Sequence, residues 1–218
     1  MRDEDSEHSG RRYGKMSAAA LVLIGFLGAG WATLEIAERA GFELIRPTAR
    51  TAIRAHFDLI DHRGQAVTEQ DFVGRPALYY FGYTYCPDVC PTHLSVLLET
   101  VDLLRAGGLE IQPVFVSIDP ARDTIDEMHG YVGHFGAPLI GLTGSAAQIE
   151  AAAKVFGVQF YKVKTDPDLP YVMDHSALSY LVDDRGRRRA TLQPGLEPEV
   201  LAEKIKAFLQ SSKTEEAA

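Results

Sequence analysis

The chain has 218 residues, of which 46% are hydrophobic and 24% are charged, a composition typical of one globular domain with appendages. Its formal net charge is −8 at pH 7. This charge argues against a nucleic-acid partner, because a nucleic-acid-binding surface is basic; it leaves acidic and basic protein partners open.

An uncharged, mostly apolar run at residues 16–34 comes first, with Arg11, Arg12 and Lys15 on its N-terminal side. Its length is close to the roughly 20 residues that span a bilayer. The positive-inside rule then predicts a single transmembrane anchor, with residues 1–15 in the cytoplasm. In a bacterial cell, such an anchor predicts a single-pass inner-membrane protein whose main domain faces the periplasm. A cleaved signal peptide is the competing interpretation.

Three further segments follow the anchor. Residues 35–54 are mixed and charged, and we expect a tether with some helix. Residues 55–210 carry the regular patterns of the folded domain. Residues 211–218 form a polar tail that we expect to be disordered.

Within the domain, short β-prone runs predict strands at residues 56–61, near 67, and at 77–83, 111–118, 139–142, 158–163, 177–182 and 190–192. One-sided apolar patterns predict helices at residues 91–107, 123–135, 145–157 and from 197 or 198 onward. Residues 165–174 are predicted to be a loop. Strands that alternate with helices, followed by a hairpin and a helix, predict a thioredoxin-like α/β sandwich with an N-terminal extension.

The chain's two cysteines, Cys86 and Cys90, lie at the corner between strand 77–83 and the next helix, in the segment GYTYCPDVCP. Both precede a proline and are biased towards extended geometry. We expect Cys90 to be the N-cap, with Pro91 as the first helical residue. The positive helix end would then lower the pKa of the Cys90 thiol. Two such thiolates form a soft chelate for Cu(I), or for Cu(II) with an added imidazole.

The cysteine pair has other interpretations at this stage. It could form a structural disulfide, remain as two buried thiols, or act in thiol–disulfide exchange. A closed structural zinc site needs four ligands, and one histidine is well placed to join the cysteines.

That histidine is His175, in the segment Asp174-His175-Ser176 before strand 177–182. In a thioredoxin topology the loop entering this strand lies beside the cysteine corner, so His175 is a candidate third copper ligand. Asp174 could hold the ring or tune the site. The alternative is a loop histidine bonded to backbone. His93, on the first turn of the cysteine helix, is the best rival ligand or else a solvated helix residue.

Taken together, these residues resemble the Sco/SenC family of copper chaperones for cytochrome c oxidase assembly. The matching segments, in family order, are GYTYCPDVCPT at 82–92, VSIDPARDT at 116–124, GLTG at 141–144 and DHSALSYL at 174–181. The resemblance implies that Cys86, Cys90 and His175 are the copper ligands. Two departures, Ile125 and Met173, fall at positions that are not ligands.

The second motif contributes Asp119, Pro120, Arg122 and Asp123, which the resemblance implies shape the surroundings of the site. From the residues alone, they could simply cap the helix that follows.

The resemblance implies a membrane-anchored metallochaperone that passes Cu(I) or Cu(II) to the dinuclear copper site of the oxidase's copper-bearing subunit. Its own copper would come from an upstream periplasmic donor. The alternative is an enzyme, a thiol–disulfide reductase in which Cys86 and Cys90 are catalytic and keep the oxidase cysteines reduced. That role needs an upstream thiol reductant in place of the donor. Replacing His175 would weaken copper binding but spare thiol exchange.

Overall fold

The computed structural model describes residues 45–47 and 56–216, except residues 137, 165, 167 and 169. The expected cytoplasmic segment, the membrane anchor and most of the tether lie outside the described residues. Within the described part, no helix is both long enough and apolar enough to cross a bilayer.

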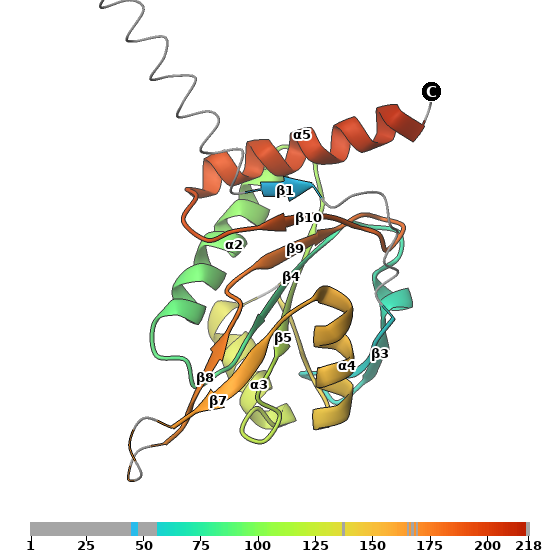
Figure 1. Cartoon of the computed structure of the whole chain (residues 1–218). Helices are drawn as coiled ribbons and strands as arrows, with labels where there is room; N and C mark the ends of the chain where they lie inside the picture. Colours follow the sequence, from blue (N-terminus) through green and yellow to red (C-terminus); the bar gives the residue numbers. More distant parts are fainter. Residues whose placement is uncertain are drawn as a thin grey trace, which may run out of the picture. The chain divides into compact units, whose positions relative to one another are not determined.

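The described chain is built on an eight-stranded sheet with the order β1-β10-β9-β4-β5-β6-β2-β3 (Figure 1). Its strands are β1 (Ile45–Pro47), β2 (Asp58–Asp61), β3 (Ala66–Thr68), β4 (Ala77–Gly82), β5 (Gln112–Ser117), β6 (Ile140–Thr143), β9 (Ser179–Val182) and β10 (Arg188–Leu192). β4, β5 and β6 run parallel, and β9 pairs antiparallel with β4. Every residue of β4 and β5 is buried, as expected for central strands whose two faces are both covered.

Helices cover both faces of this sheet. They are α2 (Val89–Ala106), α3 (Ile125–Phe135), α4 (Ala146–Phe156) and α5 (Pro198–Glu216), with a short 3-10 helix at Glu69–Phe72. Tyr79 of β4 packs its ring on Phe156 of α4, while Tyr80 packs on His93 of α2. Because neighbouring side chains of a strand point to opposite faces, α2 and α4 lie on opposite sides of β4. This confirms the thioredoxin-like α/β sandwich.

Side-chain caps begin both middle helices. Thr124 caps α3 by accepting the Glu127 amide, and Ser145 forms a capping box with Gln148 at the start of α4. Gly157 ends α4 in the left-handed region, at φ 72°.

The start of α2 differs from the prediction. The helix begins at Val89 with Asp88 as N-cap, so Cys90 is its second residue and Pro91 its third. A proline is tolerated there because the first four amides of a helix have no intrahelical acceptor in any case. The bond from the Thr92 amide to the Asp88 carbonyl closes the first turn, and its donor is the residue after Pro91, so the proline removes no bond from it.

Three other segments also differ from expectation. The predicted loop 165–174 includes the first part of a strand, β8 (Val172–His175), which pairs antiparallel with β7 (Phe160–Val163) in a separate two-stranded sheet. The tail is helical as far as Glu216, so its predicted disorder from residue 211 is wrong over that stretch. Residues 45–47, inside the expected tether, form an edge strand on β10.

Candidate metal centre

The two cysteines lie where β4 gives way to α2, and both are free thiols. Cys86 is half-buried, in the loop before the helix, and Cys90 is fully buried in its first turn. The Cys90 amide donates a hydrogen bond to Cys86 Sγ at 3.3 Å. The first turn of α2 therefore holds the Cys86 sulfur at the helix N-terminus, next to the residue that carries the second sulfur.

His175, the last residue of β8, brings its imidazole to the same corner. Its Nε2 atom lies 3.5 Å from Cys90 Sγ, although 85 residues separate the two in sequence. Its Nδ1 atom bonds to the Ser176 carbonyl at 3.1 Å, and because a carbonyl can only accept, Nδ1 carries the proton. This tautomer leaves the Nε2 lone pair facing the sulfur. Burial lowers the pKa of His175, which favours the neutral ring that a metal requires.

Of the two roles suggested for Asp174, holding the His175 ring or tuning the site, these contacts leave only the second. The backbone carbonyl of Ser176 orients the His175 ring, whereas the Asp174 carboxylate accepts a hydrogen bond from the Tyr161 hydroxyl across the β7–β8 pair. Asp174 is exposed and acts on the imidazole only through its charge, which opposes the effect of burial on the His175 pKa.

The spacing of sulfur and nitrogen suits a metal ion. Bonds of about 2.3 Å to sulfur and about 2.0 Å to nitrogen place those two ligand atoms roughly 3.4–3.8 Å apart, and the observed separation of 3.5 Å falls in this range. Within the described residues, no three or more His, Cys, Asp or Glu side chains are already gathered as a complete metal-binding set. Two of the three expected ligands are thus prepositioned, and Cys86 has to move to complete the set.

The predicted lowering of the Cys90 pKa is not found. Burial raises the pKa of this thiol to about 12, although the neighbouring Tyr80 phenol acts in the opposite direction. Desolvation of a side chain with no exposed surface outweighs the helix end here. At neutral pH Cys90 therefore holds its proton until a cation replaces it, which makes Cys90 a poor free nucleophile.

The rival ligand His93 is neither a ligand nor a solvated helix residue in this arrangement. Its ring is buried and packs against Tyr80, and its Nε2 atom lies 2.9 Å from Ser179 Oγ on β9. The contact joins α2 to the sheet. The histidines on α3, His129 and His134, are exposed.

Sequence reasoning did not single out Gly82, whose missing side chain leaves space for the site. A Cβ atom at this position would lie 3.2 Å from Cys90 Sγ and 3.3 Å from Cε1 of Tyr80. Tyr80 and Gly82 are two residues apart on β4, so they share the strand face turned towards Cys90. Side chains alternate between the two faces of the predicted strand before the cysteines, and this alternation could have identified both Tyr80 and Gly82 as neighbours of the site.

Asp123 ties the cysteine loop to the sheet and does not cap a helix. Its buried carboxylate accepts hydrogen bonds from Thr84 Oγ1 and Ser117 Oγ, each at 2.6 Å, and from the Thr84 amide. Thr84 lies two residues before Cys86, so this carboxylate sets where the loop leaves β4.

Arg122 joins the cysteine loop to the segment before His175. Its guanidinium lies 3.8 Å from the ring centre of Tyr171 and 4.9 Å from that of Tyr85, and it donates to the Tyr171 carbonyl. Asp119 accepts hydrogen bonds from both Arg122 and the Tyr171 hydroxyl. The motif 119–123 thus supports both sides of the site.

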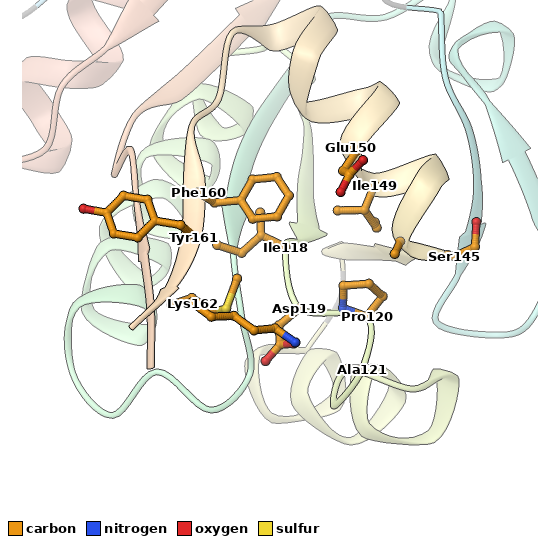
Figure 2. A pocket seen from close by; sticks show the side chains of 13 residues that line it. Ile118, Asp119, Pro120, Ala121, Ser145, Ile149, Glu150, Phe160, Tyr161 and Lys162 are labelled. Atoms are coloured by element: carbon orange, nitrogen blue, oxygen red, sulfur yellow. The ribbon is translucent and has the colours of Figure 1, made fainter. Parts of the chain in front are cut away.

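A surface cavity of about 420 Å³ lies against the same motif, between residues 118–121, the first turn of α4 and β7 (Figure 2). Figure 2 shows Ile118 and Phe160 pointing into it and Tyr161 pointing away. Met173 on its wall is two residues before His175, but the lining contains neither cysteine nor His175.

A thioredoxin-like sandwich whose strand-to-helix corner brings a CxxxC pair together with a tautomer-fixed histidine defines a thiol or metal-handling protein of that fold. The SCO1/SenC family model matches residues 45–210, and the chain belongs to this family.

Relatives and a solved structure agree with this assignment. Protein SenC of Rhodobacter capsulatus is 35% identical over 201 residues, which cover 91% of this chain and 90% of that protein. The mitochondrial SCO2 homolog of Homo sapiens is 39% identical over 175 residues, or 76% of this chain, and the match spans 66% of that relative's length. The crystal structure of Arabidopsis thaliana ScoI with copper bound has a TM-score of 0.70 and 34% identity, covering 73% of this chain and 99% of that one.

Proposed function

We propose that this chain is a copper metallochaperone that binds Cu(I) or Cu(II) through Cys86, Cys90 and His175. The observation that carries the proposal is the approach of His175 Nε2 to Cys90 Sγ at 3.5 Å, with the ring tautomer fixed by Ser176. Two thiolates and an imidazole are the donors that copper prefers. Copper bound to ScoI of Arabidopsis thaliana supports the choice of metal.

The geometry of the site also suits a copper ion that is bound and later released to a partner. Cys86 is half-buried in a loop, while Cys90 and His175 are held by α2 and β8. A copper ion would bind first between the two fixed ligands and be closed in by Cys86. Its release to a partner's thiolates would begin with the same loop ligand, by exchange of one sulfur for another.

The receiving partner in this proposal is the copper-bearing subunit of cytochrome c oxidase, at its dinuclear copper site, and copper arrives from an upstream periplasmic donor. Family membership supports this role. We further propose that residues 16–34 anchor the protein in the bacterial inner membrane, with residues 55–210 in the periplasm. Membrane fractionation of the full chain, compared with a form lacking residues 1–34, tests the anchor.

Anaerobic competition with a chromophoric Cu(I) chelator tests the ligand set. His175→Ala should weaken Cu(I) binding by about 10- to 100-fold, because one of three donors is lost, and Cys86→Ser should weaken it at least as much. His134→Ala removes an exposed histidine and serves as the matched control. Full copper affinity in either ligand variant would refute the assignment.

The second candidate is a thiol–disulfide reductase. Its support is the contact of Cys86 Sγ with the Cys90 amide, which keeps the two cysteines adjacent while both remain reduced. In this reaction the Cys86–Cys90 dithiol would become a disulfide and give two electrons and two protons to an oxidised cysteine pair on the oxidase. An upstream thiol reductant would then restore the dithiol. If His175→Ala left thiol exchange intact and a partner's disulfide were reduced without copper, the reductase role would be favoured.

A further inference from the structure

The face of β4 that leads to the cysteines carries a phenol whose hydroxyl has no partner. Tyr80 is fully buried, and among the described residues nothing lies at hydrogen-bonding distance and angle from its hydroxyl. A buried hydroxyl without a partner costs free energy, because it has lost its bonds to water. Such a group in a well-packed core calls for an acceptor that is formed in another state of the protein.

The candidate acceptor for the Tyr80 hydroxyl is the sulfur of Cys90. Cys90 Sγ and Cε1 of the Tyr80 ring lie 3.2 Å and 3.3 Å from the same point, the place of a Cβ on Gly82. The hydroxyl edge of the ring and the thiol therefore border the same space, which stays open because residue 82 is a glycine.

A neutral thiol is a weak acceptor, but a thiolate is a strong one. When copper replaces the proton of Cys90, the sulfur gains the charge that the Tyr80 O–H can stabilise. The His175 imidazole is a separate neighbour of this sulfur, with its Nε2 atom 3.5 Å from Cys90 Sγ and its ring centre 6.4 Å from that of Tyr80.

We propose that Tyr80 is a positioning residue for the copper site, and that its hydroxyl donates a hydrogen bond to the Cys90 thiolate once copper is bound. The proposal rests on the proposed function. It adds a polar contact from the buried side of the site. The contact would favour the loaded form over the empty one, because its acceptor exists only when the thiol has lost its proton.

The molecule supplies a matched control. Tyr180 on β9 is also a phenol whose buried hydroxyl has no partner among the described residues. Its ring packs on Phe81 and on Phe156 of α4, so it lies on the face of the sheet opposite to Tyr80. Tyr80→Phe and Tyr180→Phe therefore make the same chemical change, but only Tyr80 borders Cys90.

The test compares Cu(I) affinity, by anaerobic chelator competition, for the wild-type chain and the two variants. Tyr80→Phe should weaken Cu(I) binding about 10- to 100-fold, the range of one hydrogen bond to a charged acceptor. Tyr180→Phe should leave it unchanged. The sulfur-to-copper charge-transfer band of the Cu(II) form should shift in Tyr80→Phe alone, which a purely structural role would not produce. Both metal-free variants should unfold at or above the wild-type temperature.

The outcomes distinguish failure of the Tyr80 role from failure of the proposed copper-binding function. Equal Cu(I) affinity of Tyr80→Phe and Tyr180→Phe, with wild-type binding intact, overturns the role of Tyr80 and leaves the proposed function standing. A wild-type chain that binds no Cu(I) overturns the proposed function and the role of Tyr80 with it.

Discussion

Replacing Gly82 by alanine tests whether the end of β4 is shaped around the Cys90 sulfur. The added Cβ would lie 2.9 Å from Cε2 of Phe115, 3.2 Å from Cys90 Sγ and 3.3 Å from Cε1 of Tyr80. Carbon atoms pack best at about 3.5–4.0 Å, so these neighbours have to move by several tenths of an ångström. All three have no exposed surface, so they have little room to do so.

Overpacking of this kind costs about 1–3 kcal/mol. The loss of backbone freedom in the unfolded chain returns about 0.4–1 kcal/mol. We therefore expect Gly82→Ala to lower the free energy of unfolding by about 1–2 kcal/mol. Displacement of the Cys90 sulfur should also weaken Cu(I) binding about tenfold.

Chemical denaturation and chelator competition on the same preparation measure the two effects. Gly130→Ala is the control, because a Cβ at that position of α3 meets nothing within 4 Å. It should raise stability by about 0.5–1 kcal/mol, as expected for alanine in place of a helical glycine, and leave copper binding alone. Wild-type stability and wild-type copper affinity in Gly82→Ala would refute the reasoning.

Two further predictions concern the support of the site. Asp123→Asn should destabilise the fold by about 1–3 kcal/mol in denaturant titrations, because an amide cannot accept from both Thr84 and Ser117; a loss no larger than that of Asp102→Asn, an exposed salt-bridge carboxylate, would contradict this. Burial lowers the pKa of His93 to about 4 from 6.5. As the pH falls, the His93 ring is therefore protonated in the unfolded chain before it is protonated in the folded one. The contribution of the neutral ring is therefore complete above pH 6.5 and falls by about 3 kcal/mol as the pH drops to 4. His93→Gln should flatten the pH dependence of stability over that window, and an unchanged slope would count against it.

Local sequence signals located most of the elements and the parts of the site. The apolar run before Cys86 indicated a buried central strand, and Ser145 and Gly157 marked both ends of α4. These features depend on neighbours in the chain, so the sequence expresses them directly. The same holds for the family motifs, which identified Cys86, Cys90 and His175 as candidate ligands.

Where local signals competed, the prediction was wrong. Two prolines beside cysteines favoured Cys90 as N-cap, but the helix begins at Val89 because its first turn needs few internal bonds. The prolines and aspartates of 165–174 indicated a loop, whereas pairing with β7 made a strand of Val172–His175. Strand pairing depends on a partner far along the chain, which a local pattern does not contain.

By itself, the sequence determined which residue types are available to a metal and in which order the strands and helices appear. The tertiary structure decided that His175 meets Cys90, that His93 packs in the core, and that Tyr80 and Gly82 border the sulfur. It also decided the protonation of Cys90, since burial outweighs the helix end. Distances between remote segments and exclusion of water arise only when the whole sheet assembles.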